Sequence, residues 1–89
     1  MKTTEEAVTV EINGETYSGT VIRRFPPSNP KVIDSITVII DPRDQDCTAL
    51  DEIKHDSKVV ITDKGAPGYC TGDYIYKGEN YKQHIFDSK

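Results

Sequence analysis

The fold is decided by residues 8–25, VTVEINGETYSGTVIRRF. Valine and isoleucine alternate with polar residues over residues 8–12, which is typical of a strand with one buried face. Asn13 and Gly14 follow. Both residues tolerate positive φ, so they predict a two-residue type I′ hairpin turn. The segment therefore predicts a β-hairpin whose second strand runs from Glu15 to about Phe25.

Alternation on the second strand places every other residue on one face: Tyr17, Gly19, Val21, Arg23 and Phe25. Prolines at positions 26, 27 and 30 then end the strand, because proline donates no backbone hydrogen bond and restricts the residue before it. Residues 32–41 are the most apolar stretch of the chain and predict a central strand.

The rest of the chain predicts one short helix and further strands. Thr48 to His55 has the pattern of a short helix, with Thr48 and Asp51 spaced as in a capping box. The expected strands that follow are residues 58–62, 73–77 and 81–86. Gly78-Glu79-Asn80 is expected to form the turn of a second hairpin, and residues 63–72 a loop.

Composition supports a mainly β fold. Isoleucine and valine supply 17 of the 89 residues, while leucine occurs once and alanine three times. Side chains branched at Cβ pack well on a pleated sheet and lose freedom in a helix. We expect one mainly β domain over residues 7–89, a small SH3-like or OB-like barrel or sandwich of about six short strands with one short helix. The polar residues 1–6 are expected to be frayed.

Charge and chemistry exclude several classes of function. The net charge of −4 argues against a general nucleic-acid binder, and no apolar run approaches the roughly 20 residues of a membrane span. Cys47 and Cys70 are expected to be free thiols, although the spacing leaves a disulfide open. The spacing of these cysteines with His55 and His84 does not match a zinc site. We expect no catalytic residues, metal or cofactor, and no enzyme activity.

The remaining signals favour a protein-binding surface. Arginine and aromatic residues are enriched at protein interfaces, and Phe25 beside the proline-stiffened loop is the best single anchor. The acidic segment 41–56 and the exposed tyrosines offer further contacts. The candidate protein-binding residues are Arg23, Arg24, Phe25, Lys31, Asp44, Asp46 and Tyr69.

The order of elements resembles the small β-barrel head–tail joining and head-completion proteins of tailed bacteriophages. The resemblance is carried by Gly19-Thr20-Val21-Ile22-Arg23, the strand 36–41, a short helix near 50–53, Lys58-Val59-Val60-Ile61 and Gly78-Glu79-Asn80-Tyr81. It implies a virion component that binds a portal, tail or capsid surface, as a homo-oligomeric ring or a capsid decoration, and a location in the virion or host cytoplasm.

Two other functions remain open. The acids between Asp41 and Asp56 are compatible with a phage or mobile-element inhibitor of a bacterial defence enzyme, which presents carboxylates in place of phosphates. Arg23, Arg24 and Lys31 with Phe25 are compatible with a small-barrel nucleic-acid binder, although three basic residues make a weak footprint on an acidic chain.

Overall fold

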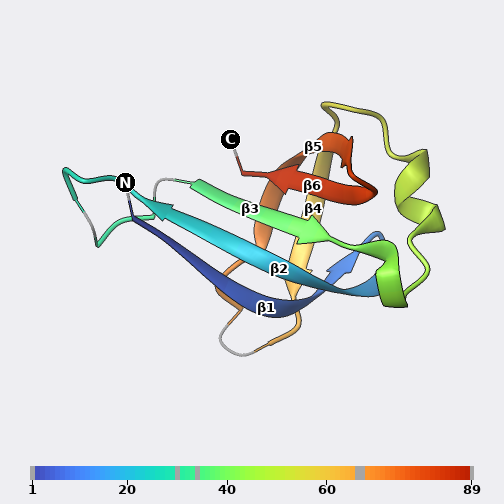
Figure 1. Ribbon diagram of the computed structural model, residues 1–89, viewed down its shortest axis with the longest axis horizontal. Coiled ribbons are helices and arrows are strands. Elements are labelled where there is room, and N and C mark those ends of the chain that lie inside the picture. Colours follow the sequence, from blue (N-terminus) through green and yellow to red (C-terminus); the bar gives the residue numbers. More distant parts are fainter. Residues whose placement is uncertain (1, 30, 34, 66–67, 89) are drawn as a thin grey trace.

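The computed structural model describes residues 2–29, 31–33, 35–65 and 68–88 (Figure 1). Two short 3-10 turns separate the third and fourth of six strands. The elements are β1 Lys2–Ile12, β2 Glu15–Phe25, β3 Ser35–Ile40, η1 Pro42–Asp44, η2 Thr48–Glu52, β4 Lys58–Asp63, β5 Gly72–Asn80 and β6 Gln83–Asp87.

The six strands form one closed antiparallel barrel in the order β1-β2-β3-β6-β5-β4. Pairing of β1 with β4 and of β3 with β6 closes the ring, so the barrel removes most of the exposed strand edges that a small open sheet would have. The prediction of a mainly β, six-stranded small barrel is confirmed. No helix in the described ranges has the length and apolar character needed to cross a membrane.

The first hairpin forms as its turn residues predict. Asn13 and Gly14 have φ values of 53° and 86°, and Ile12 pairs with Glu15 across the turn. Positive φ at both central positions is what a type I′ turn requires. The ladder continues in this register to the pair Lys2 with Phe25.

The N-terminal residues differ from the prediction of a frayed segment. Residues 2–6 belong to β1, where Glu6 pairs with Val21 and Lys2 with Phe25; Met1 lies outside the described residues. Their polar side chains are exposed on a two-stranded ribbon that extends past the barrel (Figure 1). The backbone ladder to β2 holds these residues in place, although they contribute almost nothing to the core.

The helix and the second hairpin also depart from prediction. The helical segment is shorter than expected and is a 3-10 turn, η2, whose N-cap Cys47 makes no side-chain capping bond. Thr48 donates its N–H to Asp46 at 2.9 Å and forms no capping box with Asp51. The second hairpin turns at Tyr81-Lys82, where both φ values are positive, and Gly78 lies in a β-bulge within β5.

The barrel has two ends that differ in what covers the core. η2 lies at the end of the barrel where β1 meets β2 and β5 meets β6 (Figure 1). Its Leu50 is 1% exposed and belongs to the core, and we call this the plugged end. The opposite end, where β4 finishes and β5 starts, is the open end. The buried core between them consists of Val10, Ile12, Tyr17, Val21, Val38, Ile40, Cys47, Leu50, Val59, Ile61, Cys70, Tyr74, Tyr76 and Phe86.

Candidate functional site

One edge of β1 lies along an open groove at the open end. On β1 the pairing with β4 covers only Val10–Ile12, and the Lys64 N–H extends it by donating to the Thr9 carbonyl oxygen at 2.9 Å. The chain then turns away at Gly65. Within the described residues, the stretch 2–8 of β1 therefore pairs with β2 on one side and with no strand on the other.

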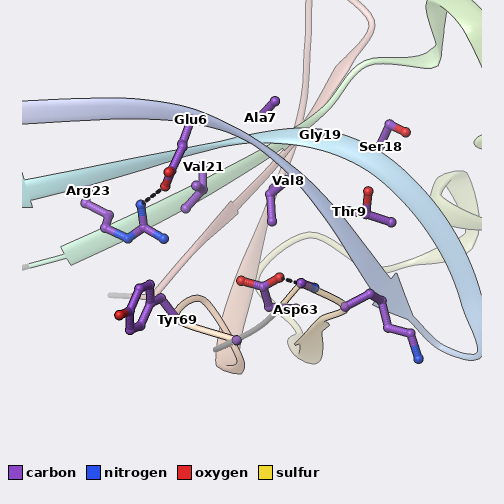
Figure 2. A pocket seen from close by; sticks show the side chains of 13 residues that line it. Glu6, Ala7, Val8, Thr9, Ser18, Gly19, Val21, Arg23, Asp63 and Tyr69 are labelled. Atoms are coloured by element: carbon purple, nitrogen blue, oxygen red, sulfur yellow. Dashed lines mark hydrogen bonds and ion pairs between the residues drawn. The ribbon is translucent and has the colours of Figure 1, made fainter.

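The groove has a volume of about 720 Å³ and runs between this edge and the loop that follows β4 (Figure 2). Its lining comes from β1, β2 and the loop: Glu6, Ala7, Val8, Thr9, Ser18, Gly19, Val21, Arg23, Asp63, Lys64, Gly65, Gly68 and Tyr69. Charged and hydroxyl-bearing residues line it together with a few apolar side chains, so the groove offers both polar and apolar contacts.

Arg23 is the charged centre of the groove. It is 9% exposed, and its Nη1 donates to Glu6 Oε2 at 2.7 Å. Its guanidinium carbon lies 5.9 Å from the centre of the Tyr69 ring, close enough for a cation–π contact (Figure 2). The Nε atom of Arg23 is buried and has no hydrogen-bond partner in the part of the chain that the structure describes. A buried donor without an acceptor is costly, so this nitrogen is suited to a ligand oxygen.

Strand alternation explains why a charged residue points inward. Arg23 lies on the same face of β2 as buried Val21, so its side chain enters the barrel mouth. The register pairs Glu6 with Val21 and Thr4 with Arg23, which makes Glu6 the diagonal neighbour of Arg23 on that face. Diagonal pairs across an antiparallel ladder are within reach of long side chains. The ion pair is therefore a direct result of the hairpin register.

Asp63 organises the opposite wall of the groove. Its carboxylate accepts hydrogen bonds from the Gly65 N–H at 2.8 Å and from the Cys70 N–H and thiol, both at 3.3 Å. Burial raises the pKa of Asp63, but these hydrogen bonds and the charge of Arg23 outweigh it, and the net pKa lies below its usual value. Asp63 is therefore ionised at neutral pH and holds the loop that carries Tyr69.

Cys70 is a free, fully buried thiol behind this wall. Burial, the hydrogen bond to Asp63 and the charge of Asp63 raise the pKa of Cys70 to about 12. Cys47 is also free and buried, and burial, followed by the nearby carboxylates, raises its pKa. A thiol must ionise to act as a nucleophile, so neither environment activates its cysteine.

An apolar extension continues the groove toward the N-terminal ribbon. A second hollow of about 490 Å³ is lined by Thr4, Glu5, Glu6, Arg23, Phe25, Ile33 and Tyr69. It shares Glu6, Arg23 and Tyr69 with the main groove, so the two hollows adjoin. Tyr69 is 69% exposed and Ile33 39% exposed. Large apolar groups at this exposure, beside a buried arginine, resemble the anchor and rim of a protein interface.

The structure brings together three of the residues that the sequence analysis selected. Arg23, Phe25 and Tyr69 line the same hollow, although Arg23 is buried beneath the surface and not displayed on it. Arg24 points to the other face of β2, donates to Thr37 Oγ1 at 2.6 Å and lies 4.0 Å from Asp87.

The other three selected residues lie away from the groove. Lys31 is exposed in the β2–β3 loop, and Asp46 is exposed next to η2 at the plugged end. Asp44 belongs to η1, and its side chain lies outside what the structure describes. Neither Lys31 nor Asp46 lines the groove or its apolar extension.

Sequence reasoning missed Glu6 and Asp63. Glu6 was hidden by the expectation of a frayed N-terminus, yet extending the hairpin register back from Asn13-Gly14 places it diagonal to Arg23. Asp63 follows an apolar strand and precedes a Gly-rich loop, where an aspartate often accepts backbone hydrogen bonds. Its approach to Arg23 depends on barrel closure and has no local signal.

Comparisons of this chain with models of protein families, with curated proteins and with solved structures found no significant match.

Proposed function

We propose that this chain is a non-enzymatic protein-binding module that accepts an extended segment of a partner along the free edge of β1. The observation that carries the proposal is the stretch 2–8 of β1, which borders a groove and lacks a strand neighbour on that side among the described residues. Peptide segments that add a strand to an exposed sheet edge bind through main-chain hydrogen bonds.

The ladder identifies the backbone groups that would meet the partner. The Thr9 carbonyl points toward β4, because it accepts the Lys64 N–H. Backbone groups of a strand in an antiparallel ladder alternate between its two neighbours. Thr3, Glu5 and Ala7 therefore present their N–H and C=O groups to the groove, and a partner strand would continue the ladder that β4 begins.

Side chains in the groove indicate what the partner offers. The unpartnered Nε of Arg23 suits an oxygen acceptor, such as a main-chain carbonyl or a hydroxyl. Phe25, Ile33 and Tyr69 suit an apolar side chain on the same segment. Glu6 and the ionised Asp63 already balance the charge of Arg23, so a further carboxylate from the partner would be repelled.

A random library of displayed heptapeptides tests the proposal directly. We expect the selected peptides to shift the backbone amide resonances of Thr3, Glu5 and Ala7 in NMR spectra. Glu5→Pro removes one N–H on the free edge and should weaken binding by about fivefold, because a hydrogen bond contributes about 1 kcal/mol. The matched control Glu5→Ala removes the same side chain but keeps the N–H, so it should bind more tightly than Glu5→Pro. Equal binding by both variants would contradict the proposal.

We propose that this module acts in virion assembly, as the head–tail proteins of tailed bacteriophages do. This proposal is supported by the resemblance in the order of elements, and there the partner strand would come from a portal, tail or capsid protein or from a neighbouring copy in a ring. Native mass spectrometry distinguishes these sources: a ring gives a closed oligomer of this chain alone, whereas a monomer requires a different protein as partner.

The two alternatives have less support. A shared basic patch for nucleic acid is lacking on β2, because Arg23 and Arg24 point to opposite faces and each lies close to an acidic residue. In the acidic segment, the carboxylates of Asp41 and Asp46 accept hydrogen bonds from the N–H groups of Arg43 and Thr48. These acids stabilise their own loops, so they are poorly placed to imitate a line of phosphates.

A further inference from the structure

Three potential metal ligands converge at the plugged end, on the opposite side of the core from the groove. Asp51, Glu79 and His84 come from η2, β5 and β6, and one ligand atom of each lies within 4.8 Å of the others. They are separated by up to 33 residues in sequence, which is the difference between positions 84 and 51. Neither the groove nor the proposed function uses this cluster.

His84 is buried and held in a fixed orientation. It is 2% exposed, and its Nδ1 atom lies 2.7 Å from the Tyr76 hydroxyl, also buried. Its Nε2 atom faces Asp51 Oδ1 at 3.4 Å. Histidines that bind metals through one ring nitrogen usually have the other nitrogen fixed by a hydrogen bond of this kind.

A β-bulge brings Glu79 to the same face as His84. Tyr76 pairs with Phe86, and an uninterrupted ladder would place Gly78 opposite His84. The bulge between Tyr76 and Glu79, with Gly78 at φ 88°, adds a residue to β5, so that Glu79 pairs with His84. Bulges re-aim side chains in this way and occur often beside functional sites.

Asp51 is exposed and lies next to the buried residue of η2. Leu50 plugs the barrel at 1% exposure, and the next residue of η2 directs its carboxylate to His84. The cluster is more than a group of surface acids, because it contains a buried imidazole whose Nδ1 is held by Tyr76 and whose Nε2 lies 3.4 Å from the Asp51 carboxylate. A ligand atom of Glu79 lies within 4.8 Å of the ligand atoms of the other two residues.

We propose that Asp51, Glu79 and His84 bind a divalent transition-metal ion at the plugged end. An imidazole nitrogen with carboxylate oxygens suits Zn²⁺ and its first-row neighbours, whereas Mg²⁺ and Ca²⁺ prefer oxygen ligands alone. The ion would connect η2 to the β5–β6 hairpin, and water would complete its coordination. Tyr76 serves as the outer-shell partner of His84 and does not touch the ion.

Isothermal titration of the chelator-treated full chain with Zn²⁺ tests the site. We expect one equivalent to bind and Mg²⁺ to bind far more weakly. Asp51→Asn and Glu79→Gln alter exposed side chains, so both variants should stay folded, and each should weaken Zn²⁺ binding by at least about tenfold. Glu52→Gln, on the same turn but outside the cluster, is the matched control and should bind as the unmodified chain does.

Two further measurements test whether Zn²⁺ binds at this cluster and not at the cysteines. Co²⁺ should give an absorption spectrum without a thiolate charge-transfer band, because the cysteines are not in the cluster. Zn²⁺ should raise the melting temperature of the unmodified chain and of Glu52→Gln, and should raise that of Asp51→Asn by less at the same Zn²⁺ concentration. Unchanged affinity in both ligand variants, a thiolate band, or no binding by the folded chain would overturn the proposal.

Discussion

The plugged end and the open end of the barrel differ in the residues that cover the core. At the plugged end η2 inserts Leu50 and the loop before it is tied down, with the Gln45 side chain donating to the carbonyl oxygens of Ser18 and Asp41. At the open end an ion pair of Arg23 with Glu6 occupies the place of an apolar plug, and β1 keeps a free edge. One end is therefore covered by an apolar side chain, whereas the other has a buried ion pair and an unpaired strand edge among the described residues.

The largest expected effect is at the plugged end. Leu50→Ala should lower the free energy of unfolding by about 3 kcal/mol, because it leaves a cavity under η2. Ile33→Ala, which removes a partly exposed side chain at the open end, should cost less than about 1 kcal/mol. Urea denaturation measures both. Similar losses of unfolding free energy in the two variants would show that both ends contribute equally to stability.

Glu6→Ala should have the next largest effect on stability. It leaves the buried guanidinium of Arg23 without its only carboxylate partner at hydrogen-bond distance in the described structure, and we expect a loss of about 2 kcal/mol. Glu5→Ala, on the exposed face of the same strand, is the control and should change stability by less than about 0.5 kcal/mol. Thermal unfolding followed by circular dichroism compares them.

Arg23→Met separates stability from binding at the open end. Replacing a buried charge by an apolar side chain of similar length is often neutral, so the free energy of unfolding should change by less than about 1 kcal/mol. The heptapeptides selected on the unmodified chain should nevertheless lose at least about tenfold in affinity, because Nε no longer donates. A stable variant that keeps full affinity would remove Arg23 from the binding site.

Asp63 gives the open end a pH dependence. Its pKa in the folded chain lies below the ordinary value of 3.8, so its contribution to stability is present above that value and is lost as pH falls through the folded pKa. Asp63→Asn should be less stable than the unmodified chain by about 1 kcal/mol at pH 7. The difference should shrink below pH 4 in urea titrations, and a constant difference across this range would contradict the assignment.

The smallest expected change concerns thiol reactivity. Cys70 is buried and its pKa is raised to about 12, so the native chain at pH 8 should react with Ellman's reagent only through unfolding. Both thiols should react at once in concentrated guanidinium. Rapid native labelling of Cys70, identified by mass spectrometry, would show that the wall of the groove opens readily.

Short-range sequence patterns predicted the barrel. The errors occurred where the same residue pattern is compatible with two different local structures. Asn13-Gly14 fixed the first register because few other structures suit that pair. Gly78 is compatible with a turn or a bulge, and Tyr81-Lys82 adopts positive φ without any residue that favours it. Strand alternation placed Arg23 on the inward face of β2, but its charge made a position on the surface the natural expectation. The carboxylate that pairs with it inside, Glu6, had been assigned to a frayed N-terminus.

The candidate sites depend on barrel closure and could not be predicted from spacing. Asp63 reaches the neighbourhood of Arg23 only because β4 pairs with β1, and Asp51 reaches His84 only because η2 folds over the barrel. Contacts of this kind join residues that are distant in sequence. A single sequence contains no pattern that places them side by side.

The short pairing of β1 with β4 has a consequence for how the barrel opens. On β1 it covers Val10–Ile12 alone, the shortest of the six interstrand ladders. Closing it also requires distant parts of the chain to meet, which makes such a seam slow to form and the first to separate. Amide hydrogens of β4 should therefore exchange with solvent sooner than those of β2. A partner strand bound in the groove would lengthen the seam and slow the exchange of the β4 amides. Binding at the β1 edge could therefore be detected by hydrogen exchange on β4, a strand that the partner does not touch.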